Sequence, residues 1–403
     1  MPVVLAAVLL PACAWRPGGS RGLPPALSVE HFSPNRCSLS VDFPCREDRE
    51  CPPGESCVSA LVTEADVEMR DGGHSALVGE KILWVFGDTI SSDRTLRSAT
   101  AAWSALGSPW KLEEEVDERN RPRQFFPFTS TELEFNERTL PSCCEEQEGC
   151  PPGDPYCRCP PRTDCRVRIA LWPGDVVDRG DGSAFCLYEK LFVGAAYYDY
   201  RRVYTGVAVA RSGRTVAERL RAGDGTPLVL FRGDEPRFLH ATAVGETVYV
   251  WGSANREGCV VDVFLGRVPR ARLAEREAFE FWNGHGWVPE VAEASPVLTR
   301  AQGGLGSVVW SDALRRFVAA YADLCTGGNK VLLRFSPKPE GPWSEPLVLD
   351  LAPFGASPDA YYALLHSALS RSGFLVLSYF DFAGPEKGQI RLLRLDPGAR
   401  ARS

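Results

Sequence analysis

Hydrophobic and polar positions alternate in short runs along most of this chain, and the runs come in pairs. Each pair consists of two apolar runs, rich in Val, Leu, Phe, Tyr or Trp, around a short turn containing Gly, Asp or Ser. This pattern predicts a β-hairpin. Hairpins are predicted over residues 74–86, 182–193, 239–251, 306–321 and 365–379.

Further apolar runs, such as 203–210 and 330–335, follow the hairpins and would complete four-stranded units. Repeated units of this kind are typical of a β-propeller. We therefore expect an all-β fold, a five-bladed β-propeller over residues 61–396. A β-sandwich with additional strands is the alternative.

The N-terminal region has the features of an exported protein. Residues 3–10 form an apolar run too short to span a membrane. The run ends in Leu10-Pro11-Ala12-Cys13, which is similar to a bacterial lipoprotein cleavage site. We expect residues 1–13 to be a signal peptide or a lipoprotein signal, with a lipid on Cys13 as the open alternative. Residues 14–33, rich in Gly, Pro, Ser and Arg, predict a flexible tether.

The number and clustering of the cysteines indicate the cellular compartment in which the protein works. The chain has 14 Cys, of which four lie within residues 37–57 and six within 143–165. Such clusters predict disulfides and an oxidising environment, here periplasmic, outer-membrane-anchored or extracellular. A zinc site is less favoured, because the spacings are irregular and neither cluster contains a His. We expect a small disulfide-rich segment at 34–60 and a Cys-rich insertion at about 111–168.

The net charge and the absence of several known motifs exclude some classes of function. The net charge is -7, and no basic cluster with interleaved aromatic residues suggests nucleic-acid binding. The sequence contains no phosphate loop, Gly-x-Ser-x-Gly elbow, His-Glu-x-x-His motif or sialidase Asp-box. No cofactor is predicted. A structural calcium in the central channel stays open, although no Asp-x-Asp-x-Asp loop is present.

Two short motifs carry a family resemblance. The sequence Asp71-Gly-Gly-His74 precedes Val85-Phe-Gly-Asp-Thr89. Together they resemble the opening of domain-of-unknown-function family 4185, whose members are five-bladed propellers. The resemblance implies glycoside hydrolase activity on furanose polymers such as D-arabinan, which some members of that family have. The layout is also similar to glycoside hydrolase family 43.

The resemblance implies a set of catalytic carboxylates. Asp71 precedes the first inner strand, Asp175 lies in Trp172-Pro-Gly-Asp175, and Glu235 lies in Asp234-Glu-Pro236. Glycoside cleavage needs a proton donor and a second carboxylate that acts as base or nucleophile. We expect Glu235 to be the acid and Asp71 the base or nucleophile, with Asp88 or Asp175 tuning them. Alternatively, these acids only form turns and caps.

Other residues are candidates for substrate binding. Three of the five His lie at or just before inner strands, and aromatic rings can stack on the apolar face of a sugar. The candidates are His74, His240, His366, Trp172, Trp251, Trp310 and Tyr361, the last followed by Tyr362.

The sequence therefore predicts a monomeric, exported glycoside hydrolase acting on a polysaccharide. The rival is a non-catalytic propeller that binds carbohydrate or protein at the cell surface. A catalyst needs two carboxylates across one funnel, whereas a binder needs only aromatic and hydrogen-bonding groups there.

Overall fold

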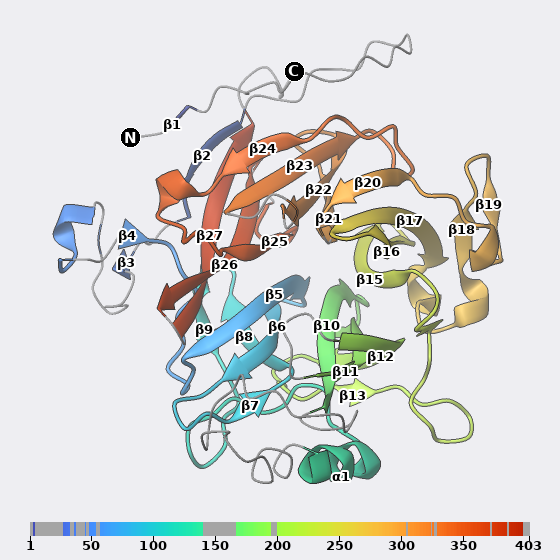
Figure 1. Ribbon diagram of the computed structural model, residues 1–403, viewed down its shortest axis with the longest axis horizontal. Helices are drawn as coiled ribbons and strands as arrows, with labels where there is room; N and C mark the ends of the chain where they lie inside the picture. Colours follow the sequence, from blue (N-terminus) through green and yellow to red (C-terminus); the bar gives the residue numbers. More distant parts are fainter. Residues whose placement is uncertain are drawn as a thin grey trace.

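Five β-sheets surround a common axis, which confirms the predicted five-bladed propeller (Figure 1). The computed structural model describes residues 3–4, 27–32, 36–37, 45, 48–53, 57–139, 167–194, 200–303, 305–323, 325, 329–370, 373–384 and 387–397.

Each blade is an antiparallel sheet, and its first three strands follow the chain outward from the axis except in blade I, where β6 pairs with both β7 and β8. Blade I contains β5 (Met69–Val78), β6 (Lys81–Ile90), β7 (Leu96–Arg97), β8 (Thr100–Ala105) and β9 (Ser108–Glu113). Blade II contains β10 (Arg168–Asp178), β11 (Ser183–Val193), β12 (Tyr200–Arg211), β13 (Glu218–Arg219) and β14 (Phe231–Arg232). Blade III contains β15 (Arg237–Val244), β16 (Thr247–Glu257), β17 (Val260–Pro269), β18 (Glu280–Trp282), β19 (Trp287–Val288) and β20 (Leu298–Gln302). Blade IV contains β21 (Leu305–Ser311), β22 (Arg316–Ala322), β23 (Lys330–Ser336) and β24 (Leu347–Asp350). Blade V contains β25 (Tyr361–Leu365), β26 (Leu375–Gly384), β27 (Lys387–Pro397), β2 (Leu27–His31) and β1 (Val3–Val4).

Shorter elements decorate the propeller. A two-stranded ribbon joins β3 (Arg36–Cys37) to β4 (Cys57–Val58), and helix α1 (Ser130–Thr139) follows blade I. The 3-10 turns are η1 (Asp48–Glu50), η2 (Arg270–Arg272), η3 (Arg276–Ala278), η4 (Val291–Glu293) and η5 (Ala352–Phe354).

The innermost strands form a closed ring. Strand β5 contacts β10, followed in turn by β15, β21 and β25, and β25 contacts β5 again. The contacts are tight: a Cβ added to Gly306 on β21 would lie 1.9 Å from the carbonyl oxygen of Ala363 on β25. Between the blades, apolar side chains pack into buried clusters, and Trp84 and Trp251 are among the largest fully buried side chains.

Every innermost strand has an irregularity where it pairs with the second strand of its blade. The register shifts lie at Gly72/His74 in β5, Pro173/Val176 in β10, Phe238/His240 in β15, Leu305/Ser307 in β21 and Tyr361/Leu364 in β25. A bulge re-aims the side chains near it, and here it turns polar residues toward the axis.

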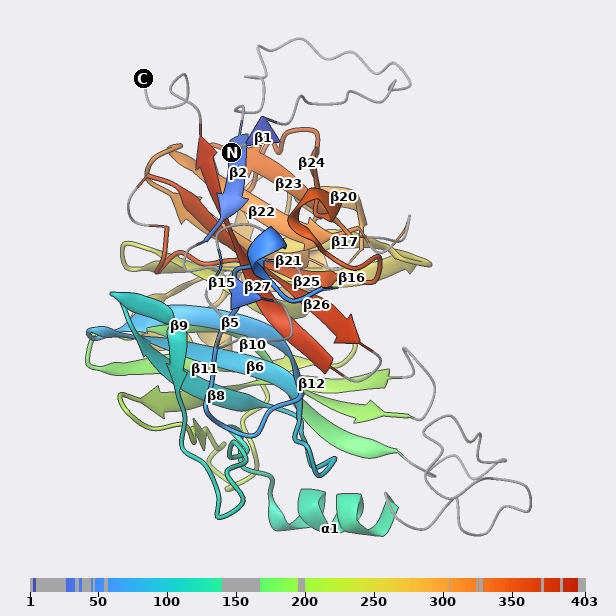
Figure 2. The same cartoon turned by 90° about the vertical axis from the view of Figure 1, so that its left-hand side faces the viewer.

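The N-terminal strand β2 is hydrogen-bonded to the C-terminal strand β27 and so extends blade V (Figure 2). The expected tether over 14–33 is therefore corrected for residues 27–31, which are a strand. A second correction concerns residues 182–193. They form one continuous strand, β11, which pairs with β10 across the turn that precedes it.

A disulfide joins Cys259 to Cys325, linking blades III and IV. Neither cysteine belongs to the two predicted clusters. In the first cluster, Cys45 and Cys51 each take part in a disulfide. The second cluster and Cys13 lie outside the described residues. Among the described residues, no helix has the length and apolar character needed to cross a membrane.

Candidate functional site

Asp71 lies near the start of the first inner strand, at one end of the axis. Two glycines follow it with positive φ angles, +78° at Gly72 and +101° at Gly73. This backbone, which glycine adopts without strain, forms the bulge that turns Asp71 inward. Its Oδ2 accepts a hydrogen bond of 2.9 Å from the hydroxyl of Tyr361.

The Phe86-Gly87-Asp88 sequence has a steric explanation. A Cβ on residue 87 would lie 2.2 Å from Asp71 Oδ1, which is far inside van der Waals contact. Only glycine therefore leaves room for the Asp71 carboxyl group beside this strand. The motif on β6 and the acid on β5 are two parts of one site.

The environment of Asp71 makes it a proton donor near neutral pH. Burial, and then the charge of Asp88, raise the pKa of Asp71 to about 7. Hydrogen bonds from Tyr361 and from the backbone of Asp88 oppose this shift. A carboxylic acid with such a pKa can hold its proton at neutral pH and release it to a leaving group.

Asp88 accepts at both of its carboxylate oxygens. Arg168 Nη2 lies 2.5 Å from Asp88 Oδ2, and Trp172 Nε1 donates to Oδ1 over 3.0 Å. Both donors come from β10, so Asp88 joins blade I to blade II. The arrangement satisfies an ionised carboxylate.

A second ion pair lies where blades II and III meet. Arg237, the first residue of β15, donates to Glu189 from two of its guanidinium nitrogens, Nε and Nη2, with Nε 2.9 Å from Oε2. The Glu189 side chain is 1% exposed and that of Arg237 32% exposed. Glu189 therefore fixes an arginine whose outer edge reaches solvent. Burial lowers the pKa of Arg237, but Glu189, Tyr200 and Tyr362 outweigh it and raise the pKa.

A polar chain lies deeper along the axis. His74 Nδ1 is 2.6 Å from Asp175 Oδ1, and His74 Nε2 is 3.3 Å from the hydroxyl of Tyr362. Asp175 Oδ2 also accepts from the backbone N–H of Ala241 and lies 3.8 Å from His240 Nδ1. The chain thus connects blades V, I, II and III.

Tyr362 holds an unusual backbone conformation. Its φ is +62°, a left-handed value that costs a tyrosine conformational energy, and it lies in the β25 bulge. Burial raises the pKa of Tyr362, and the carboxylates of Asp71, Glu189 and Asp175 raise it further, against the effect of Arg237. The tyrosine therefore lies among the acids of the site.

Glu235 does not join these carboxylates. It lies in the turn between β14 and β15, where Oε2 accepts from the backbone N–H of Arg232 over 2.7 Å. Its Oε1 is 3.1 Å from Arg276 Nη2. These contacts are those of an acid that stabilises a turn, the alternative weighed from the sequence.

Only some of the other residues predicted to bind substrate lie near these carboxylates. Tyr361 and Trp172 bind the carboxylates Asp71 and Asp88, and His74 and His240 lie on the axis beside Asp175. His366 is fully buried against Trp84, with Nδ1 2.7 Å from Ser75 Oγ, and burial lowers its pKa to about 3. Two tryptophans lie elsewhere: Trp251 is in the core between blades III and IV, and Trp310 lies near the β21–β22 turn and donates to Asp312.

Sequence reasoning missed Glu189, Arg237, Arg168 and Tyr200. Glu189 carried a signal, since it is an acid inside an apolar run that is now seen to be one continuous strand. The others show no distinguishing sequence pattern, because their roles depend on which blades become neighbours.

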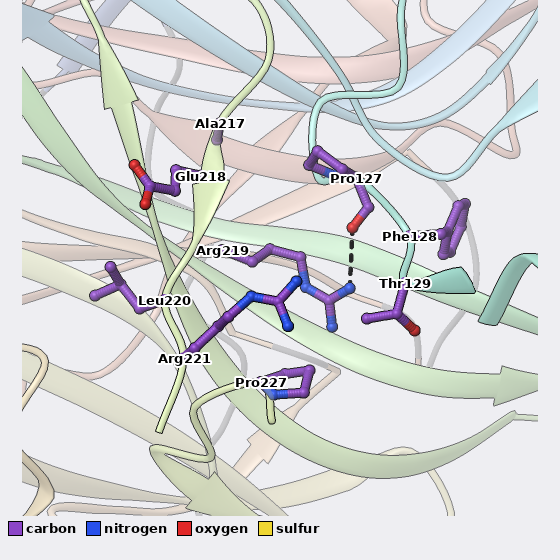
Figure 3. A pocket seen from close by; sticks show the side chains of 9 residues that line it. All are labelled: Pro127, Phe128, Thr129, Ala217, Glu218, Arg219, Leu220, Arg221 and Pro227. Atoms are coloured by element: carbon purple, nitrogen blue, oxygen red, sulfur yellow. Dashed lines mark hydrogen bonds between the residues drawn. The ribbon is translucent and has the colours of Figure 1, made fainter. Parts of the chain in front are cut away.

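A separate pocket of about 300 Å³ lies at the outer part of blade II (Figure 3). One of its two arginines, Arg219, donates to Glu132 of α1, to the hydroxyls of Tyr188 and Tyr204, and to the carbonyl of Pro127. The guanidinium is thus used to fasten the start of α1 to the blade. No group of three or more His, Cys, Asp or Glu able to hold a metal ion occurs among the described residues.

The comparisons with known proteins confirm the family resemblance over part of the chain. Residues 199–379 match the family model described as Domain of unknown function (DUF4185). This range begins after the motifs at 71–74 and 85–89 that first indicated the family. No curated protein matches the chain.

Three of the solved structures to which the chain is similar are a GH43_1 enzyme, a GH62 alpha-L-arabinofuranosidase and a family 117 glycoside hydrolase. The GH43_1 enzyme from Xanthomonas citri is 11% identical with a TM-score of 0.46, over 85% of this chain and 92% of that chain. The catalytic domain of the Coprinopsis cinerea GH62 alpha-L-arabinofuranosidase is 7% identical with a TM-score of 0.43, over 84% and 96%. Zg3597, a family 117 glycoside hydrolase from Zobellia galactanivorans, is 12% identical with a TM-score of 0.43, over 84% and 89%.

Proposed function

We propose that this chain is a glycoside hydrolase that cleaves a polysaccharide at the Asp71–Asp88 end of the propeller axis. The observation that carries the proposal is the pairing of two unlike carboxyl groups. Asp71 has a pKa raised to about 7 by burial and by Asp88, whereas Asp88 accepts from Arg168 and Trp172. Carboxyl groups whose environments differ in this way are suited to separate acid and base roles.

The assignment exchanges the roles expected from the sequence. Asp71 is the general acid, which protonates the leaving oxygen of the glycosidic bond. Asp88 is the carboxylate that activates water or attacks the anomeric carbon. Glu235 is held by Arg232 and Arg276, which supports a structural role for it.

Two arginines complete the site. Arg168 positions Asp88, and Arg237, fixed by Glu189, offers its outer edge to the hydroxyl groups of a sugar. The chain of Tyr362, His74 and Asp175 holds the floor of the site together across four blades.

The experiment is a hydrolysis screen of the wild-type protein on arabinan, xylan and galactan, with reducing ends as the readout. Asp71→Asn and Asp88→Asn should each lower the rate on the cleaved polymer about 100-fold or more. Asp181→Asn, in the β10–β11 turn, is the matched control and should leave it unchanged. Hydrolysis that survives both site substitutions would refute the assignment, and binding without hydrolysis would favour the non-catalytic propeller.

We propose further that the protein works outside the reducing cytoplasm. The disulfide between Cys259 and Cys325 supports this, since such bonds persist in oxidising compartments. Fractionation of expressing cells, with palmitate labelling of the wild type and of Cys13→Ser, would test export and the lipid anchor together.

A further inference from the structure

Tyr200 is an exposed aromatic side chain at an unusual place. It is 42% exposed, and the other large hydrophobic side chains exposed to this degree in the described part of the chain are aliphatic: Leu96, Leu106, Leu133, Val229 and Val348. An aromatic ring left in water loses the free energy that its burial would contribute. The exposed part of this side chain is therefore open to a bound ligand.

The ring lies beside the acids of the site. Tyr200 begins β12, and its ring centroid is 5.6 Å from that of Trp172, with an interplanar angle of 65°. Trp172 is itself fixed by the hydrogen bond from its Nε1 to Asp88. The exposed ring is therefore supported by a tryptophan that is held by the proposed catalytic carboxylate.

Tyr200 also lies near the second ion pair. Its phenol is close enough to act electrostatically on the guanidinium of Arg237, which binds Glu189. The ring is thus linked to Asp88 through Trp172 and also lies in the neighbourhood of Arg237. A ligand resting on it would lie near both groups.

We infer that Tyr200, supported by Trp172, is a stacking platform for one neutral sugar unit of the polysaccharide, next to the bond that is cleaved. The C–H face of a sugar ring packs on an aromatic face, while its hydroxyl groups bind polar groups at the edge. Arg237 is the donor placed to bind such a hydroxyl. The inference rests on the proposed function, because it names a subsite of that same site.

The charges of the site select a neutral glycan. Arg168 is paired with Asp88 and Arg237 with Glu189, so the charge of each of these two arginines is offset by a carboxylate. A uronic acid or a sulfated sugar would bring another anion into this environment. Neutral pentose or hexose polymers meet no such penalty.

The test is direct binding without turnover. Titration calorimetry would measure arabinotriose, xylotriose and a galacturonic acid trisaccharide against the Asp71→Asn protein and against the same protein with Tyr200→Ala. We expect one neutral trisaccharide to bind, with its affinity lowered about tenfold by Tyr200→Ala, and no binding of the uronate. Tyr200→Phe should retain most of the affinity because the ring remains.

Leu106→Ala is the matched control, since Leu106 is equally exposed, at 43%, in the β8–β9 turn of blade I. Equal affinity of the Tyr200→Ala and Leu106→Ala proteins would overturn the inference, as would failure of both neutral trisaccharides to bind or tighter binding of the uronate. Binding that depends on Tyr200 in a protein that hydrolyses nothing would contradict the proposed catalysis but support the platform. In an active protein, Tyr200→Ala should raise KM while leaving kcat within about twofold.

Discussion

His74 and Asp175 meet across the boundary between blades I and II, with 2.6 Å between Nδ1 and Oδ1. Because a carboxylate only accepts, Nδ1 carries the proton of this bond. A neutral His74 then leaves Nε2 to accept from Tyr362, so that one contact sets the direction of the next.

Removal of this carboxylate should loosen the propeller at its axis. Asp175→Ala leaves both His74 and the backbone N–H of Ala241 without their acceptor. We expect a loss of about 3 kcal/mol in the free energy of unfolding, measured by urea denaturation. Asp224→Ala, in an exposed turn, should change it far less. A similar effect of the two variants would contradict the structural role of the axial chain.

The raised pKa of Asp71 predicts that Asp71→Asn, which should lower the activity, increases the stability of the protein at high pH. Its folded pKa of about 7 exceeds the ordinary value of 3.8, so the folded state favours the protonated form. The contribution of Asp71 to the free energy of unfolding is therefore complete below about pH 4 and is lost as pH rises toward 7. Asp71→Asn should therefore melt at a higher temperature than wild type at pH 8, with the difference shrinking toward pH 4. If the wild type melts higher at pH 8, the assigned pKa is wrong.

The same group should shape the pH dependence of hydrolysis. As the general acid, Asp71 must be protonated, so kcat/KM should fall as pH rises through about 7. Tyr361→Phe removes a hydrogen bond that lowers the pKa of Asp71, and the basic limb should then move to higher pH. If the basic limb of the pH profile stays at the same pH in Tyr361→Phe, a group other than Asp71 controls that limb.

Gly87 offers a steric test of the site. In Gly87→Ala the added methyl would meet Asp71 Oδ1 at 2.2 Å, so the carboxyl group must move. We expect at least a tenfold loss of kcat and a shifted pH profile. Gly107→Ala, where no atom lies within 4 Å of the new Cβ, is the control. Full activity of Gly87→Ala would argue against the present position of Asp71.

Glu132 should make the protein sensitive to acid. Burial opposes its ionisation, but hydrogen bonds from Arg219, Lys190 and Thr129 lower its pKa to about 2, below the ordinary 4.5. The contribution of Glu132 to the free energy of unfolding is complete above about pH 4.5 and is lost as pH falls toward 2. Glu132→Gln should therefore cost stability at pH 7, roughly 3 kcal/mol, and much less at pH 3. Thermal melting of both proteins at the two pH values measures this, and an equal difference at both would exclude it.

The fold could be predicted because its signal is local. Strands such as β6 and β16 are apolar over most of their first half, and turns separate them from the strands before them. The number of blades followed from repeating this signal. The error at 182–193 arose because Glu189 and Lys190 interrupt an apolar run as a turn would, although their charges are paired with Arg237 and Glu132 from other elements.

The site could be predicted only where a short motif marked it. Asp71, Gly87 and Asp88 lie in two such motifs on adjacent strands. Arg168 and Arg237 act across blade boundaries, and nothing near them in sequence reports a partner about 50 to 80 residues away. Glu235 was misleading because an acid before proline suits a turn as well as a catalytic site.

The pairing of β2 with β27 has a consequence for the order of folding. Strand β2 can pair only with the two-residue β1 until β27 has been synthesised, so blades I to IV can form before the ring is locked. Until then blade V exposes an unpaired edge, where strands of other chains could add. Chaperone binding and aggregation should therefore be concentrated in this late interval, and a soluble peptide with the sequence of residues 27–31 would compete for that edge only while it lasts.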